Sequence, residues 1–494
     1  MSSVSTRVLQ STGFLLLIQL LQRGLGIIST LILARILAPE QFGIIALVAI
    51  ALQFFDILAD AGNQHYIIQK AEISDTDLNT AWTLEILIKS SMMLLVIVSA
   101  PLLAHYFNEP KLTLALWISS LVLPLKALRN PILMLQAKQL NYRPIFKLNL
   151  WQKILSFVAV ISIAMIWQNF WAIVAGNLVA ALVYTLGSYY INDYRPTLST
   201  RQLGEQWLFS KWLMFRGLIG FVRSQIDSLL VSRWFGTREL GGFHLLRELA
   251  VMPAVSVVIP ATEPLQAAIA DDRFNQSALA YRTRFSLVLL SSMLLPISLF
   301  MWLYPQQIVY ILLGNQWQQY AELLRPFSLF FFTFCLFALS SNACLAVGQA
   351  KLLFWFDLIS TLIIVAILVY FRASTLLELT WLRAWLAVFT TLALMVLLER
   401  KTSFNWAKLT LLLAPVLISI LVSHAALILI DSVFAFSAFL TLLVNGLLFC
   451  TIFIGCYIAS CHVAAKYSAE MQRYVQHLQR LLPTWLNFRF KTQQ

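Results

Sequence analysis

Long, uninterrupted apolar segments dominate this chain and restrict its fold more than any other feature. Each is close to the roughly 20 residues that a helix needs to cross the hydrocarbon core of a bilayer. Only 12% of the residues are charged, against about 25% in an ordinary soluble domain. Runs of this kind favour helices over the alternating strands of an outer-membrane barrel. The pattern predicts an all-α polytopic membrane protein with about fourteen transmembrane helices, at residues 10–34, 41–66, 81–104, 112–137, 145–167, 170–192, 210–234, 240–268, 282–304, 320–347, 350–371, 376–398, 406–430 and 435–461.

A short motif occurs twice, each time where one apolar segment ends and the next begins. Residues 34–43 read ARILAPEQFG and residues 232–241 read SRWFGTRELG, so that both the arginines and the final glycines are 198 residues apart. A second match, Gln-Ala-Lys at 136–138 and again at 349–351, has an offset of 213. Six predicted spans separate the two long copies, and an even number leaves both copies in the same orientation. The chain is therefore expected to contain two parallel six-helix repeats, related by an axis along the membrane normal, as in transporters whose halves move against each other.

The motif itself favours a structural role over a binding role. Arg35 and Arg233 lie at span ends, where they would anchor the membrane interface. Pro39 suits the first turn of a helix, and Gly43 permits close helix packing.

The repeat and the remaining spans predict a domain organisation with five parts. These are an N-terminal six-helix bundle, a polar cytoplasmic linker, a C-terminal six-helix bundle, two additional transmembrane helices and an amphipathic basic tail, at residues 1–192, 193–209, 210–400, 401–461 and 462–494.

The basic residues of the connecting segments are distributed unevenly. With the N-terminus placed in the cytoplasm, 20 of these lysines and arginines fall on the cytoplasmic side and 5 on the opposite side. This asymmetry follows the positive-inside rule and places both termini in the cytoplasm. It also accounts for most of the net charge of +13, so the basic surplus indicates topology, and no nucleic-acid partner is expected.

Motifs for covalent chemistry are absent from the sequence. It has no P-loop, no HExxH and no GxGxxG, and its five cysteines and six histidines lack metal-ligand spacing. We therefore expect no catalytic residue, no metal site and no cofactor.

Several basic residues fall inside the predicted spans, where an ion at the bilayer centre costs about 2.5–3.5 kcal/mol on insertion scales. Such residues face a wet cavity or a partner, and a cavity lined by bases between the two halves would attract an anionic group such as a phosphate. The candidates for this cationic, substrate-binding cavity are Arg23, Arg129, Arg223 and Arg247.

Other interpretations of the charges inside the spans remain open. Glu85 and Lys89 have i,i+4 spacing and would pair with each other, and Arg223 and Asp227 have the same spacing. Four bases lie near span ends and favour snorkelling to the interface: Lys126, Lys153, Arg216 and Arg325. The acids that would serve ion coupling, or alternatively capping and pairing, are Asp56, Asp60 and Asp227.

The tail after Cys461 has an amphipathic pattern. Lys466, Arg473 and Arg480 are seven residues apart, and apolar residues favour another face. This predicts a helix on the anionic cytoplasmic lipid surface, with a plain surface helix or a disordered tail as the alternatives.

Two stretches carry a family resemblance. The segment from Arg23 to Gln69, which contains ARILAPEQFGIIALV, and the segment 135–150, LQAKQLNYRPIFKLNL, resemble Wzx-type polysaccharide flippases. These belong to the polysaccharide-transport branch of the multidrug/oligosaccharidyl-lipid/polysaccharide exporter superfamily. The resemblance implies an inner-membrane flippase that moves undecaprenyl-diphosphate-linked oligosaccharide from the cytoplasmic to the periplasmic leaflet by alternating access.

The resemblance also implies partners. It implies secondary transport that is coupled to an H⁺ or Na⁺ gradient and uses no ATP site. It also implies that the protein functions together with glycosyltransferases and a polysaccharide polymerase. One alternative is a drug or cation antiporter of the same superfamily, which would have an acidic cavity. Another is a membrane-embedded polysaccharide polymerase or ligase, which would need a large extracytoplasmic loop.

Overall fold

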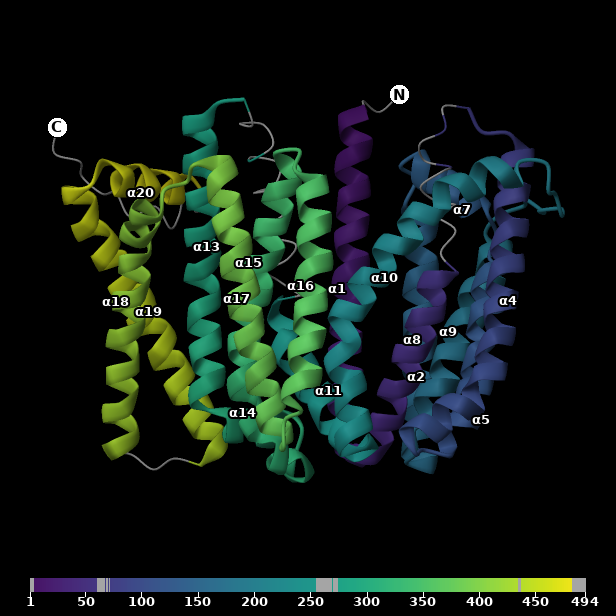
Figure 1. Ribbon diagram of the computed structural model, residues 1–494, viewed down its shortest axis with the longest axis horizontal. Helices are drawn as coiled ribbons and strands as arrows, with labels where there is room; N and C mark the ends of the chain where they lie inside the picture. Colours follow the sequence, from purple (N-terminus) through teal and green to yellow (C-terminus); the bar gives the residue numbers. More distant parts are fainter. Residues whose placement is uncertain are drawn as a thin grey trace. The chain divides into compact units, whose positions relative to one another are not determined.

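The computed structural model describes residues 4–59, 67, 70, 72–254, 269, 274–433 and 437–481. Regular secondary structure within these residues is entirely helical (Figure 1), which confirms the predicted all-α class. Eleven helices in this part of the chain are long and apolar enough to cross a membrane, or twelve if one bent pair counts as a span. The chain is a multi-pass membrane protein. The predicted number of fourteen spans is not confirmed, because α10 (Leu203–Phe235) and α11 (Thr237–Pro253) are not among the eleven.

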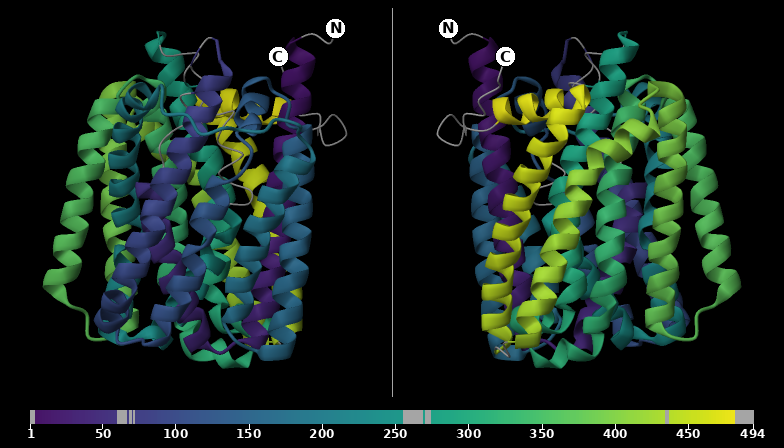
Figure 2. Two further views of the ribbon diagram at one scale, coloured as in Figure 1. Left: turned by 90° about the vertical axis from the view of Figure 1, so that its right-hand side faces the viewer. Right: turned by 90° about the vertical axis from the view of Figure 1, so that its left-hand side faces the viewer.

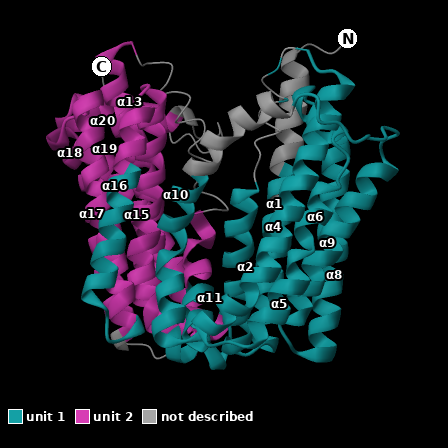
Figure 3. Ribbon diagram, turned by 45° about the vertical axis from the view of Figure 1, so that its right-hand side comes forward, with its two compact units in different colours: residues 1–246, 312–320, 357–376 teal, residues 247–311, 321–356, 377–494 magenta. Residues whose placement is uncertain are grey.

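The chain forms two compact units (Figure 3). Unit 1 contains residues 1–246, 312–320 and 357–376, and unit 2 contains residues 247–311, 321–356 and 377–494. The predicted bundles at 1–192 and 210–400 are sequence repeats that are expected to move as bodies. The compact units do not test such movement, so this division stays a prediction.

Unit 1 is built from helices that pack side by side. Helix α8 lies along α9 and also against α1, while α2 packs on α4, α5 and α10. Proline begins α2 at its first turn, and Ser74 forms a capping box with Asp77 at the start of α4. Besides α10 and the first part of α11, its helices are α1 (Val4–Ile36), α2 (Pro39–Leu58), α4 (Asp75–Phe107), α5 (Lys111–Ser120), α6 (Val122–Ala127), α7 (Ile132–Lys138), α8 (Arg143–Trp167) and α9 (Trp171–Tyr190).

Unit 2 has α13 at the centre of its contacts, packed against α15, α18 and α19. Figure 2 shows α18 and α19 as a closely packed pair, with α20 turning away from the axis of α19. The remaining helices, some shared with unit 1, are α13 (Gln276–Leu303), α14 (Pro305–Leu312), the 3-10 helix η2 (Asn315–Leu323), α15 (Leu324–Ala346), α16 (Ala350–Phe371), α17 (Leu376–Thr402), α18 (Trp406–Val433), α19 (Ala438–Tyr467) and α20 (Ala469–Leu481).

The repeated motif forms a crossing between the first turns of α2 and α11, both in unit 1. A Cβ added at Gly43 would overlap the carbonyl oxygen of Thr237, and one added at Gly241 would overlap the carbonyl oxygen of Pro39. Each glycine therefore packs on the first residue of the other helix, and the two contacts are related by the sequence repeat. The structural role predicted for Gly43 is confirmed, because only glycine allows the backbones to approach this closely.

Side chains around this crossing, which we call the glycine crossing, reinforce it. Arg238 Nε lies 3.2 Å from Glu40 Oε1. The indole of Trp317 in η2 is fully buried, donates a hydrogen bond to the carbonyl oxygen of Ala34 at 2.7 Å, and meets Phe42 edge-on at 5.3 Å between ring centroids.

The C-terminal helix α20 docks on unit 2. Its Met471 and Tyr474 are fully buried, and Arg284 of α13 donates to Glu470 at 2.6 Å. Burial raises the pKa of Tyr474 far above its usual range, so the phenol stays neutral and hydrogen-bonds Tyr457 at 2.8 Å. These apolar side chains of α20 thus face protein. The predicted contact with anionic lipid stays a prediction, and residues 482–494 lie outside the described part of the chain.

Candidate functional site

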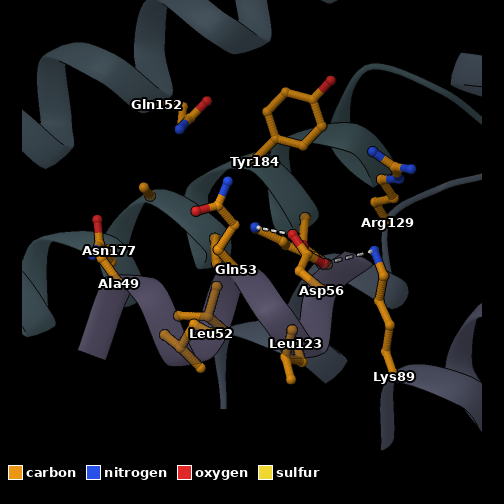
Figure 4. A pocket seen from close by; sticks show the side chains of 15 residues that line it. Ala49, Leu52, Gln53, Asp56, Lys89, Leu123, Arg129, Gln152, Asn177 and Tyr184 are labelled. Atoms are coloured by element: carbon orange, nitrogen blue, oxygen red, sulfur yellow. Dashed lines mark hydrogen bonds and ion pairs between the residues drawn. The ribbon is translucent and has the colours of Figure 1, made fainter. Parts of the chain in front are cut away.

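A cavity of about 590 Å³ lies inside unit 1, among helices α2, α4, α6, α8 and α9. Its wall combines three basic side chains and one acid with amides, hydroxyls and small apolar residues. Figure 4 shows these side chains converging from the surrounding helices. The cavity is lined by Ala49, Leu52, Gln53, Asp56, Lys89, Val122, Leu123, Lys126, Arg129, Gln152, Asn177, Ala180, Ala181, Tyr184 and Thr185.

The charged side chains of the cavity form a chain of alternating sign. Lys126 Nζ donates to Asp56 Oδ2 at 3.2 Å, and Lys89 Nζ lies 3.9 Å from the other oxygen, Asp56 Oδ1. Lys89 also pairs with Glu85 Oε1 at 2.9 Å, and Arg129 Nη2 reaches the same oxygen at 3.1 Å. We call these five residues the cavity charge cluster. Three cations and two carboxylates give the cluster a formal charge of +1, and the three cationic side chains line one cavity.

The two acids of the cluster differ in exposure. The side chain of Glu85 is 7% exposed and that of its partner Lys89 is 10% exposed. By contrast, the side chain of Asp56 is 37% exposed and that of Lys126 is 47% exposed. The cluster therefore has an enclosed end at Glu85, where separating the charges would leave a buried ion, and an open end at Asp56, where water competes for both partners.

Two of the cavity bases lie beside a break between two helices. Helices α6 and α7 meet at an angle of 62°, and Pro131 follows Asn130 at the point where the helix cannot continue. Polar side chains of α9 satisfy the freed backbone groups: Thr185 donates to the carbonyl of Leu125, Tyr189 donates to that of Leu128, and Ser188 accepts from the amide of Asn130. Such breaks are tolerated in membranes where they line a cavity, and here Lys126 and Arg129 sit at the break.

Uncharged polar residues line the rest of the cavity. Gln53, Gln152 and Asn177 come from three different helices, and Gln53 also accepts a hydrogen bond from Gln225 of α10 at 2.8 Å. Amides, with Tyr184 and Thr185 beside them, suit hydroxyl-rich ligands because they both donate and accept hydrogen bonds. The sequence interpretation missed these residues. Their signal was the presence of amides inside otherwise apolar spans.

The structure brings two of the sequence candidates, Arg129 and Asp56, into this cavity. The i,i+4 pair of Glu85 and Lys89 is confirmed. The ammonium of Lys126 pairs with Asp56 at 3.2 Å, and the snorkelling that the sequence favoured for this lysine stays a prediction.

The other candidate arginines lie elsewhere. Arg23 of α1 has Nη1 buried without a hydrogen-bond partner among the described residues, and it is not part of the cavity lining. Arg223 of α10 pairs with Asp357 of α16 at 2.6 Å. Arg247, in unit 2, lies with its guanidinium carbon 5.7 Å from the ring centroid of Phe330. Their role as substrate-binding residues stays a prediction.

Of the remaining acids predicted for ion coupling, Asp227 is buried in α10 and accepts a hydrogen bond from the amide of Ser228 at 3.0 Å. Asp60 lies outside the described residues. The other bases for which snorkelling was expected do not line the cavity. Arg325 pairs with Glu322 at 2.9 Å at a partly exposed position, and the side chain of Arg216 is outside the described part.

Comparisons with known proteins agree with this architecture. The family model described as "Polysaccharide biosynthesis protein" matches residues 32–322. The chain is 27% identical to the succinoglycan biosynthesis transport protein ExoT of Rhizobium meliloti (strain 1021) over 353 residues, which is 68% of each chain. It is 26% identical to the lipopolysaccharide biosynthesis protein WzxC of Escherichia coli (strain K12) over 50% of this chain and 52% of that one. Its fold matches the lipid II flippase MurJ in an inward closed conformation, with a TM-score of 0.69 at 12% identity, covering 88% of this chain and 96% of that one.

Proposed function

Because the chain belongs to the polysaccharide biosynthesis protein family, as its resemblance to Wzx-type flippases predicted, we propose that it is a flippase of lipid-linked oligosaccharide. In this proposal it moves an undecaprenyl-diphosphate-linked repeat unit from the cytoplasmic to the periplasmic leaflet of a bacterial inner membrane. The names of its relatives support transport in polysaccharide biosynthesis, and the fold shared with MurJ supports a transporter architecture.

The observation that carries the proposal is the cavity charge cluster within the spans of unit 1. Three basic groups, on Lys89, Lys126 and Arg129, surround two carboxylates, and this arrangement leaves a positive excess inside the membrane. A diphosphate is the ligand such an excess favours, because charge-assisted hydrogen bonds to phosphate oxygens offset the cost of holding cations there. The neighbouring amides and hydroxyls would contact the first sugar residues.

The position of the cluster fits loading from the cytoplasmic leaflet. Asp56 lies in the last turn of α2, Glu85 and Lys89 lie in the first four turns of α4, and both of these helix ends are cytoplasmic in the predicted topology. The headgroup would therefore enter the cavity from the side where lipid-linked oligosaccharides are assembled. Both termini are cytoplasmic in this proposal.

The mechanism requires no covalent step from the protein. Binding at the cavity, a change of access and release into the other leaflet suffice, with an H⁺ or Na⁺ gradient as the driving force and with glycosyltransferases and a polymerase as functional partners. A drug or cation antiporter is disfavoured, because an organic cation would meet Lys89, Lys126 and Arg129 at the cavity wall.

Reconstitution tests this proposal. Purified protein in proteoliposomes should move a fluorescent undecaprenyl-diphosphate-linked oligosaccharide between leaflets faster than protein-free vesicles do, without ATP. A fluorescent cationic drug under the same ion gradients is the matched control. Transport of the drug without transport of the lipid-linked oligosaccharide would contradict the flippase proposal.

A further inference from the structure

The carboxylate of Asp56 occupies the place that an anionic ligand would take. One of its oxygens lies 3.2 Å from the Lys126 ammonium and the other lies 3.9 Å from the Lys89 ammonium. Figure 4 shows Asp56 on α2 with dashed lines to two side-chain nitrogens from neighbouring helices. A phosphate that bridged both lysines would need the same space and the same donors.

The second acid of the cluster cannot play this part. Glu85 is enclosed, with Lys89 and Arg129 both bonded to a single oxygen, Oε1. Its removal would take the closest ion pair from Lys89 and the Glu85 pair from Arg129, which is costly at an enclosed position. Glu85 therefore holds the bases in place, whereas Asp56 and Lys126, both more than a third exposed, form a pair of the kind that contributes little to stability and separates readily.

We propose that Asp56 is an internal counter-anion that competes with the diphosphate of the substrate for Lys89 and Lys126, and so sets how tightly the headgroup is held and how readily it leaves. This inference rests on the proposed function for the identity of the ligand. When the headgroup binds, Asp56 swings away from the lysines. When access changes, the carboxylate returns and displaces the headgroup.

Competition between Asp56 and the diphosphate predicts opposite effects on binding affinity and on transport rate when the carboxylate is removed. Loss of a negative charge about 4 Å from the bound anion removes a repulsion and an internal competitor together, and couplings of this type are worth about 5- to 150-fold. Asp56→Asn should therefore bind diphosphates about tenfold more tightly, while its maximal transport rate falls because release slows. Asp56→Glu, which retains the charge, should resemble the unaltered protein in both properties.

Binding is measured on the full-length protein in detergent with farnesyl diphosphate, with inorganic pyrophosphate as a second probe and farnesol as the uncharged control. The tightening should appear with both diphosphates, because the competition acts on the charged group, and should be absent with farnesol. Asp193→Asn is the matched control: it removes the same charge from an exposed position outside the cavity and should leave all three affinities unchanged.

Weaker or unchanged diphosphate binding by Asp56→Asn, with Asp56→Glu folded and active, would overturn the counter-anion role. The melting temperature of each variant separates this result from misfolding. If Asp56→Asn tightens diphosphate binding but the protein moves no lipid-linked oligosaccharide, the competition stands and the proposed function fails. If transport is observed but affinity does not respond to Asp56, only the counter-anion inference fails.

Discussion

The two ends of helix α2 meet the rest of unit 1 in opposite ways. Near its start, Gly43 packs directly on the backbone of α11 at Thr237. At its last turn, Asp56 faces a cavity of about 590 Å³ and pairs with side chains that reach it from α4 and α6. A single helix thus carries a close backbone contact at one end and an open charged site at the other.

The two regions also differ in their relation to the sequence repeat. The glycine crossing uses both copies of the motif, since Gly43 and Gly241 contact each other's helices. Asp56 has no such counterpart, because the residue 198 positions later is Ala254. The repeated motif therefore lies where two helices pack closely, whereas Asp56 of the candidate binding site has no counterpart in the repeat.

Glu85→Ala should have the largest effect on stability. It leaves Lys89 and Arg129 without the acid that compensates them at the enclosed end of the cluster, and breaking a buried pair costs about 3–5 kcal/mol. The unfolding of purified protein in detergent measures the loss. Asp56→Ala is the internal comparison, with an expected cost below about 1 kcal/mol because its partner Lys126 is half exposed. Equal losses of stability for the two variants would contradict the proposed difference between the enclosed end at Glu85 and the open end at Asp56.

Gly43→Ala should have the next largest effect. The added methyl overlaps the carbonyl oxygen of Thr237, which is backbone and cannot rotate away, so we expect a loss of about 1–3 kcal/mol from overpacking. Gly220→Ala in α10 is the matched control, because nothing lies within 4 Å of its added Cβ. A lower melting temperature for the control than for Gly43→Ala would contradict the close crossing.

Arg238→Ala should have the smallest effect. Arg238 and Glu40 are 58% and 48% exposed, so their pairing at the crossing contributes about 0.2–1 kcal/mol. High salt should weaken even this contribution. A melting temperature that falls as far as that of Gly43→Ala would mean that charge, and not the fit of the two glycines, holds α2 and α11 together.

Much of the architecture follows from the sequence because it depends on local patterns. Apolar runs predict the helices, and the Glu85–Lys89 pair follows from one helical turn. The sequence also predicted that Gly43 permits close packing with another helix, but it did not identify that helix. The arrangement of the cavity was not predictable, since it depends on contacts between distant segments. Arg129 reaches Glu85 across 44 residues, and Lys126 reaches Asp56 across 70.

The pairing of Lys126 could not be predicted from its position near the end of a predicted span, where snorkelling to the interface is favourable. In the structure its ammonium reaches Asp56 of α2. It lies just before a bend whose carbonyls are satisfied by Thr185 and Tyr189 of α9. Pro131 signals a break in the sequence, but the direction of the bend depends on the hydrogen bonds that α9 supplies.

The bases of the unit 1 cavity are proposed to bind the headgroup of a lipid-linked oligosaccharide. This binding is tested by the transport rate of the fluorescent lipid-linked substrate in proteoliposomes that contain the double variant Lys126→Gln, Arg129→Gln. The double variant Lys111→Gln, Arg143→Gln makes the same chemical change at exposed positions outside the cavity. We expect the cavity variant to lose about tenfold or more of the rate and the control to keep it. Equal rates for the two folded variants would contradict the claim.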